Sequence, residues 1–251
     1  MLPTESGVRN FDAEILDLPN RRYAYSFDYL MHAYMMRVFG PHMNGTSALE
    51  LGCYEGAFTK RIAERFTSVT IVDAAMHSVM ATMDALSDIA IKKRAINSTF
   101  ESAPLPDTYF DAIFLIHTLE HVEDPVHVLK LCKKWLRPTG RLFLAVPNAH
   151  AASRQIAEKM VLIKECYEVT AGEKAHGHQR TYSLGTLTDD VIAAGLTVVE
   201  RGGIMFKSLA NFQIDQALQN GVIDMNYISG CFELGKVYPE LCASVYAVCS
   251  R

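Results

Sequence analysis

Residues 49–56 read Leu49-Glu50-Leu51-Gly52-Cys53-Tyr54-Glu55-Gly56, an apolar strand running directly into a glycine-containing turn. A helix is predicted after the turn, because Phe58, Ile62 and Phe66 recur at a spacing of four. Glycine permits a tight turn and a close approach of the backbone to a ligand. The N-terminus of a helix adds free N–H groups and the positive end of the helix dipole. The stretch therefore predicts a nucleotide-like cofactor at a strand–helix turn, a feature that dehydrogenases share.

Predicted strands and helices alternate on both sides of this turn. Strands are expected at residues 47–51, 68–73, 91–96, 111–116 and 141–146, and helices at residues 57–66, 76–86 and 126–136. This alternation predicts a parallel sheet with its ligand at the carboxyl ends of the strands. Two later strands, at 196–200 and 243–249, are separated by a long connection, which predicts an antiparallel last strand. The expected fold class is α/β, a doubly wound, mostly parallel seven-stranded sheet with helical lid insertions.

The rest of the chain is expected to surround this sheet. Residues 1–44 should form an N-terminal helical cap, because residues 21–39 are rich in aromatic and Met side chains at helical spacings. The main domain should span 45–251, with insertions at about 149–182 and 203–240. Helices are expected at 149–163, at 183–194 with Ser183 as the N-cap, and at 211–219. An irregular loop is expected at 164–180. The segment 206–238 has enough apolar residues for a homodimer interface, although the sequence does not determine the oligomeric state.

Composition narrows the class of partner. The 251-residue chain has a net charge of −4, and its basic residues form no cluster, so we expect no nucleic-acid partner. Residues 1–6 lack the basic and apolar regions of a signal peptide, and no apolar run approaches about 18 residues, so we expect no membrane partner. Six cysteines without a C-x-x-C pair favour a reduced, cytoplasmic protein.

Four further motifs follow the first turn in order. Asp73 ends the second predicted strand, where an acidic side chain can accept both hydroxyls of a ribose. Phe100-Glu101 is followed by PLPDTYFD at 104–111, which leads into the next strand. HTLEHVEDP at 117–125 follows that strand, and LRPTGRLFLAVPN occupies 136–148.

This ordered series resembles the class I S-adenosylmethionine-dependent methyltransferases of small molecules. The resemblance covers residues 45–150 in detail and implies S-adenosyl-L-methionine as the cofactor. By position, it implies that Asp73 holds the ribose hydroxyls and that His117 lies beside the cofactor near the transferred methyl group. The other cofactor-binding residues that it implies, for the loop and for the adenine, are Glu50, Gly52, Cys53, Tyr54, Gly56, Phe100 and Glu101. Members of the family usually have glycine where this chain has Tyr54.

Histidines are the candidate catalytic groups, because an imidazole with a near-neutral pKa suits removal of a proton from a hydroxyl. The candidates are His117, His121 and His178, and position favours His117. The H-x-x-E-H spacing of 117–121 is also found in zinc peptidases, but here it follows a buried strand, so no metal is expected. The candidate substrate-binding residues are Tyr25, Asn148, His178 and Arg180.

The preferred function is a methyltransferase that acts on a small-molecule oxygen nucleophile, such as a natural product, a sugar or a small acid. N-methylation of an amine or amino sugar is an alternative. An NAD-dependent oxidoreductase would share Gly52, Gly56 and Asp73, but it does not account for the later motifs. A non-catalytic binding protein with this fold is a third hypothesis, motivated by Tyr54.

Overall fold

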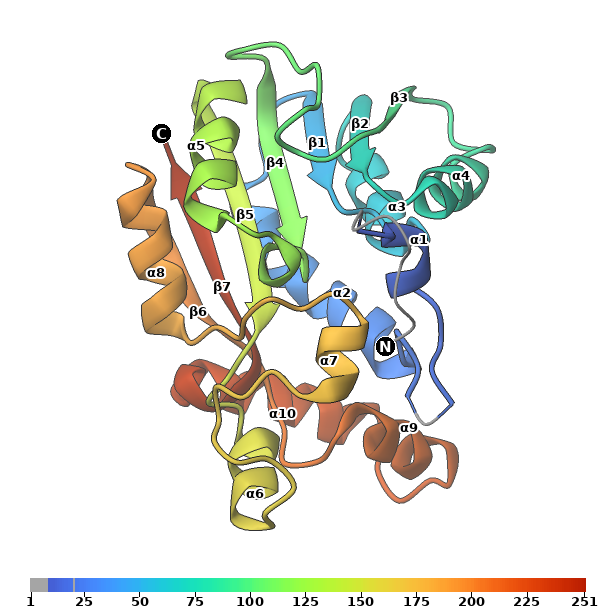
Figure 1. Ribbon diagram of the computed structural model, residues 1–251, viewed down its shortest axis with the longest axis vertical. Coiled ribbons are helices and arrows are strands. Elements are labelled where there is room, and N and C mark those ends of the chain that lie inside the picture. The colour runs from blue at the N-terminus through green and yellow to red at the C-terminus, as the bar shows by residue number, and fades with distance from the viewer. Residues whose placement is uncertain (1–8, 20) are drawn as a thin grey trace.

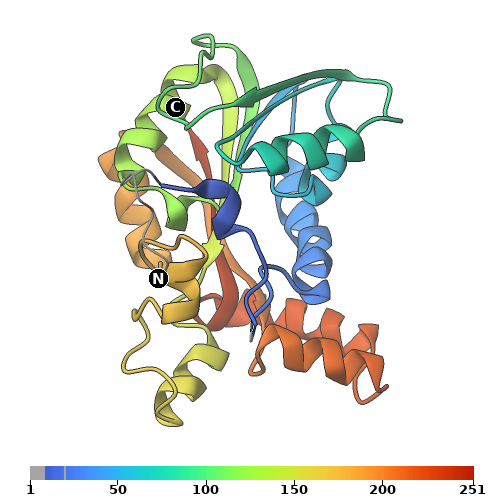
Figure 2. The same ribbon diagram turned by 45° about the vertical axis from the view of Figure 1, so that its right-hand side comes forward.

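The computed structural model describes residues 9–19 and 21–251. The expectation about a signal peptide rests on residues 1–6, which lie outside these ranges. The start of the predicted N-terminal cap also lies outside them. Figures 1 and 2 show a central sheet between two layers of helices. Further helices gather at the end of the molecule where β4 terminates, which is the lower end in Figure 1. No helix in the described ranges is both long enough and apolar enough to cross a membrane.

In the described residues, seven strands form one sheet in the order β3-β2-β1-β4-β5-β7-β6. The strands are β1 (Ser47–Leu51), β2 (Ser68–Asp73), β3 (Lys92–Asn97), β4 (Phe110–Ile116), β5 (Leu136–Pro147), β6 (Thr197–Phe206) and β7 (Cys242–Ser250). β7 is antiparallel to both of its neighbours, β5 and β6, and the other neighbouring strands are parallel. The predicted fold class, including the antiparallel last strand, is confirmed.

Helices cover both faces of the sheet. Their bounds are α1 (Phe11–Glu14), α2 (Ser26–Phe39), α3 (Ala57–Ala63), α4 (Met76–Ala85), α5 (Pro125–Trp135), α6 (Ala152–Lys159), α7 (Ala171–Ala175), α8 (Leu184–Ala193), α9 (Asn211–Gln219) and α10 (Met225–Val237). Three short 3-10 helices are η1 (Gly40–His42), η2 (Leu119–His121) and η3 (Pro239–Leu241). One apolar core joins the sheet to α2, α3, α9 and α10, and the other joins it to α5 and α8. The central strands are therefore buried on both faces, as expected for a parallel sheet.

The sequence places most elements correctly and misses parts of the C-terminal half. β6 continues to Phe206 through Gly202 and Gly203, where a strand end was expected. Glycine is needed there because a Cβ on Gly203 would lie 2.3 Å from the Pro239 carbonyl oxygen. β5 begins at Leu136, five residues earlier than expected, because Leu136 pairs with Phe110 of β4 before a register shift.

Two helices occupy segments for which none was expected. α10 follows α9 within the predicted insertion at 203–240 and buries Ile228 and Phe232, which are four residues apart on one helical face. α7 lies inside the predicted irregular loop at 164–180. Thr170 caps α7 by accepting a hydrogen bond from the Glu173 N–H, and the Glu173 carboxylate accepts one from the Thr170 N–H.

Candidate active site

A cavity of about 990 Å³ lies at the carboxyl ends of β1, β2 and β4. Ligand pockets are typically about 300–1,000 Å³, so this cavity lies at the upper end of the usual range. Its walls come from the turns after these strands, from the segment before α2, and from residues 173–178. The position is the one expected for a ligand in an open α/β sheet.

The turn after β1 has the conformation that its glycines predict. Gly52 has φ +78°, and a Cβ there would lie 2.6 Å from the Thr118 Oγ1 atom. Tyr54 has φ +45°, so it adopts the left-handed conformation that normally favours glycine. Its ring packs against Tyr23, with ring centroids 4.7 Å apart, and both residues line the cavity. The tyrosine therefore keeps a glycine-like backbone in this turn and adds an aromatic wall to the site.

Asp73 connects the ends of β1 and β2. Its Oδ2 atom accepts a hydrogen bond from the Cys53 N–H at 2.9 Å, and its Oδ1 atom accepts one from the Ala75 N–H at 2.9 Å. Burial raises the pKa of Asp73, although these N–H groups oppose the shift. The Cys53 thiol also donates to Oδ2 at 3.7 Å, so these bonds fix the carboxylate in the cavity wall while Oδ1 keeps a lone pair for a further donor.

Glu50 is the most buried acid of the turn, with 1% of its surface exposed. Its Oε2 atom accepts a hydrogen bond from the Thr59 hydroxyl of α3 at 2.5 Å. Burial raises the pKa of Glu50 to about 8, because charge is poorly solvated there. Glu50 therefore joins the first strand to the following helix while lining the cavity.

His117 follows β4 with φ +50°, another left-handed non-glycine residue. Its backbone N–H donates to the Ala145 carbonyl at 2.8 Å, and its Nε2 atom lies 2.8 Å from the Ser244 hydroxyl. Burial lowers the pKa of His117, which favours the neutral imidazole. A neutral imidazole can accept a proton, so the ring can act as a base, although the lowered pKa makes it a weaker base than a free imidazole.

Glu120, His121 and His178 form a compact group in the wall of the same cavity. One ligand atom from each residue lies within 4.8 Å of the others. The rings of His121 and His178 meet edge to face with centroids 4.5 Å apart. Burial lowers the pKa of His178 to about 4.

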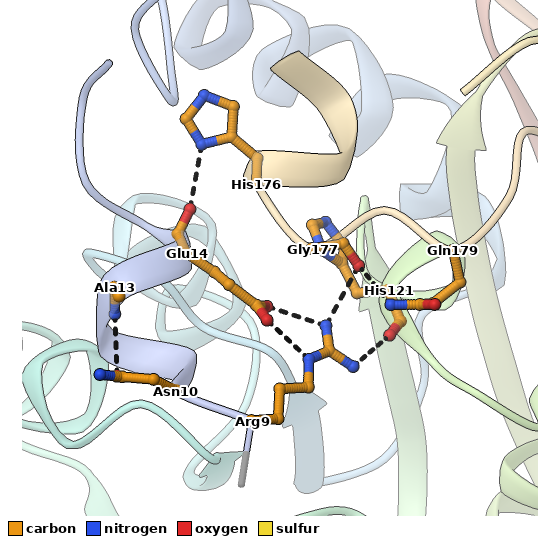
Figure 3. Close-up of polar contacts among 8 residues, drawn as sticks. All are labelled: Arg9, Asn10, Ala13, Glu14, His121, His176, Gly177 and Gln179. Atoms are coloured by element: carbon orange, nitrogen blue, oxygen red, sulfur yellow. Dashed lines mark hydrogen bonds and ion pairs between the residues drawn. The ribbon is translucent and has the colours of Figure 1, made fainter. Parts of the chain in front are cut away.

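The segment around α1 holds this region in place, as Figure 3 shows. Arg9 pairs with Glu14 at 2.7 and 2.8 Å and also donates to the backbone carbonyls of His121 at 2.9 Å and Gly177 at 3.1 Å. The His176 Nδ1 atom lies 3.0 Å from the Glu14 carbonyl oxygen. The N-terminal segment therefore ties the end of β4 to the loop that carries His178.

Lys207, directly after β6, is a buried cation in the cavity wall and was not predicted from the sequence. It is 7% exposed, its Nζ atom donates to the Leu209 carbonyl at 2.9 Å, and it lies 5.6 Å from the centroid of the Phe27 ring. Burial lowers the pKa of Lys207 to about 8. No carboxylate in the described part of the chain forms an ion pair with it.

Most of the predicted site residues line this one cavity: Tyr25, Glu50, Gly52, Cys53, Tyr54, Asp73, Phe100, Glu101, His117, His121, Asn148 and His178. Within the described ranges, Gly56 and Arg180 are the two that do not. Gly56 has φ +77° and precedes the first residue of α3, where a Cβ would lie 3.0 Å from Thr82 Cα.

Arg180 and Asn148 make bonds that hold the backbone. The guanidinium of Arg180 donates to the carbonyls of Val122 and Glu123. The amide nitrogen of Asn148 donates to the Glu240 and Cys242 carbonyls at 2.8 Å, and its oxygen accepts from the His150 N–H at 3.0 Å. Their polar atoms are therefore engaged by the protein itself.

Comparison with known proteins identifies the family. A family model described as a methyltransferase domain matches residues 21–201. A ubiquinone biosynthesis O-methyltransferase of Idiomarina loihiensis is 30% identical over 188 residues, covering 73% of each chain. The chain belongs to this family of S-adenosylmethionine-dependent methyltransferases. The finding favours the methyltransferase over the oxidoreductase and the non-catalytic binding protein.

Solved structures share the fold at lower identity. The N-methyltransferase NodS of Bradyrhizobium japonicum, in complex with S-adenosyl-L-homocysteine, is 14% identical with a TM-score of 0.57 over 90% of this chain and 88% of that one. The [4+2]-cyclase SpnF is 17% identical with a TM-score of 0.58 over 89% of this chain and 80% of that one. Since enzymes of different reaction type have this fold, the acceptor must be argued from the site.

Proposed function

We propose that the protein transfers a methyl group from S-adenosylmethionine to an oxygen atom of a small molecule, with a phenolic hydroxyl as the preferred acceptor. The observation that carries the proposal is the position of His117, which lies in the same cavity as Asp73 and the Gly52 turn and is held by Ser244 through its Nε2 atom. The name of the Idiomarina relative, an O-methyltransferase, supports an oxygen acceptor. Aromatic side chains on the cavity wall, including Tyr25, Phe27 and Phe212, suit a flat ring.

The residues of the turn fit the cofactor. Asp73 would accept hydrogen bonds from the ribose hydroxyls, Gly52 lets the backbone approach closely, and Phe100 would lie against the adenine. When bound, S-adenosylmethionine supplies a methyl group whose carbon–sulfur bond breaks, leaving the electron pair on sulfur, as the acceptor oxygen forms the new bond to carbon. Alignment of acceptor and donor provides much of the rate of such a displacement.

His117 would take the proton of the acceptor hydroxyl. The Ser244 hydroxyl fixes the ring through Nε2, which leaves Nδ1 for the acceptor. Lys207 would face an anionic or ionising group of the acceptor, because it is a buried cation with a backbone carbonyl as its hydrogen-bond partner. His121 and His178 remain alternative bases, since both line the cavity.

A panel of methyl acceptors tests the proposal. The purified protein is incubated with S-adenosylmethionine and matched phenols and anilines, and release of S-adenosylhomocysteine is measured with mass spectrometry of the product. Turnover of phenols with an O-methyl product is expected. Methylation of the anilines alone would overturn the oxygen acceptor. Absence of S-adenosylhomocysteine binding by folded protein in calorimetry would overturn the cofactor site.

A further inference from the structure

Glu120 has an unusual environment for a carboxylate. It is 1% exposed, and neither carboxylate oxygen has a hydrogen-bond partner in the described part of the chain. Buried acids are almost always paired, because an unpartnered buried polar group costs about 1–3 kcal/mol or more. The residue lines the cavity beside His121, so a cationic ligand there would satisfy both oxygens.

The neighbouring imidazoles supply the other ligands that a metal ion needs. Ligand atoms of Glu120, His121 and His178 lie within 4.8 Å of one another. Ligands about 2.1 Å from a tetrahedral metal are about 3.4 Å apart, so small side-chain rotations would bring these atoms onto one ion. Two histidines and one carboxylate form a donor set of catalytic zinc sites, which keep a further position open. His117, the first residue of the H-x-x-E-H motif, bonds Ser244 instead, and His178 provides the second imidazole.

The backbone around the three residues is fixed from several sides. The Gln179 N–H donates to the Glu120 carbonyl at 2.9 Å, which places His178 beside η2. Arg9 donates to the His121 carbonyl (Figure 3), and Arg180 donates to the next two carbonyls. Bonds of this kind orient metal ligands before the ion arrives. The charge of Arg9 is matched by Glu14, so Arg9 does not oppose a bound cation by its full charge.

We infer that Glu120, His121 and His178 bind a divalent transition-metal ion such as Zn²⁺, with an open position facing the cavity. This replaces our sequence-based expectation of no metal. The next step rests on the proposed function: the open position of the ion takes the acceptor oxygen. Coordination lowers the pKa of a hydroxyl, so the O–H bond breaks with its electron pair left on oxygen and its proton passes to His117 or to water. The net charge of the site is then zero, because the divalent ion is balanced by the Glu120 carboxylate and by the oxygen anion of the acceptor.

Calorimetry on the full chain tests the site. The protein is stripped with a chelator, dialysed and titrated with ZnCl₂, with S-adenosylhomocysteine titrated in parallel. Binding of about one ion per chain is expected. Glu120→Gln and His178→Gln should each weaken zinc binding more than about 10-fold. The matched changes at exposed Glu123 and His127, Glu123→Gln and His127→Gln, should leave it unchanged.

Cobalt substitution gives a readout that needs no variant. Added CoCl₂ should produce visible absorption bands typical of nitrogen and oxygen ligands. Cysteine thiolate bands would show that the free thiols hold the ion and would overturn the site. Absence of zinc binding by the wild-type chain, or unchanged binding in both Glu120→Gln and His178→Gln, would also overturn it. Because S-adenosylhomocysteine binding is measured separately, failure of the metal site is distinguishable from failure of the proposed function.

Discussion

The Nε2 atom of His117 lies 2.8 Å from the Oγ atom of Ser244. His117 follows β4 and Ser244 belongs to β7, so the contact spans the intervening strand β5. The reversed last strand therefore contributes a side chain that orients the candidate base. The left-handed backbone of His117, with φ +50°, aims the ring at this partner.

Replacing His117 should slow the chemical step more than it weakens binding. General-base catalysis typically contributes about 10²–10⁴-fold, so His117→Ala should lower kcat by about 10²-fold with little change in the KM for S-adenosylmethionine. Ser244→Ala leaves the imidazole but frees its orientation, so its loss should be smaller. His127→Ala, an exposed histidine at the cavity rim, is the control. Unchanged turnover in His117→Ala would mean that another group accepts the proton of the acceptor hydroxyl.

Asp73 should matter for cofactor affinity. Asp73→Ala removes a charged acceptor whose hydrogen bonds contribute about 1.5–3 kcal/mol, equivalent to about 10–100-fold in the Kd for S-adenosylhomocysteine. Asp84→Ala, an exposed acid on α4, should leave the Kd unchanged. Circular dichroism checks that the loss of the bonds to Cys53 and Ala75 has not unfolded the turn. Equal affinities of Asp73→Ala and the wild type would remove Asp73 from the cofactor site.

The order of motifs correctly placed Glu50, Gly52, Asp73 and His117 around one cavity, because these residues lie at strand ends that are side by side in a parallel sheet. Glu50 and Asp73 are separated by 23 positions, yet the pairing of β1 with β2 brings their strand ends together. Local patterns and strand order suffice for such a site.

The remaining part of the cavity wall depends on tertiary contacts that no local pattern encodes. Lys207 reaches the cavity because β6 continues through Gly202 and Gly203, which read as a strand end in the sequence. His178 joins Glu120 because Gln179 bonds the Glu120 carbonyl across a long connection. The H-x-x-E-H motif was visible, but its spacing pointed to His117 as the partner and not to His178.

Tyr54 provides a test of backbone strain. A left-handed conformation costs a non-glycine residue about 1–2 kcal/mol, so Tyr54→Gly should be more stable than Tyr54→Ala by about 1 kcal/mol. Urea unfolding of both variants measures the difference. The control is the same pair of variants at Glu55, the exposed next residue. Glu55→Ala should be as stable as Glu55→Gly or more stable. Greater stability of Tyr54→Ala than Tyr54→Gly would contradict the positive φ.

Lys207 should determine affinity for anionic acceptors. Lys207→Met keeps the length of the side chain and removes its charge, so the KM of a carboxylate-bearing phenol should rise about 10-fold or more. The KM of an uncharged phenol and the Kd of S-adenosylhomocysteine should change little. Lys236→Met, on the exposed face of α10, is the control. An equal rise of KM for charged and uncharged acceptors would indicate a packing effect instead.

Glu50 should make stability depend on pH in a defined window. Its pKa is about 8 in the folded protein against an ordinary value of 4.5, so between these values the folded state holds a proton that the unfolded state has lost. The free energy of unfolding should therefore fall as pH rises from 4.5 to 8, by at most about 1.4 kcal/mol per pH unit from this group. Glu50→Gln retains a neutral side chain at every pH and can still accept from Thr59, so its decline over the window should be shallower than that of the wild type. Urea unfolding at pH 5, 6.5 and 8 compares the two proteins with Glu64→Gln, an exposed control. Parallel profiles of Glu50→Gln and the wild type would mean that Glu50 is already ionised in the fold, and that Thr59 and the turn stabilise its charge more than burial penalises it.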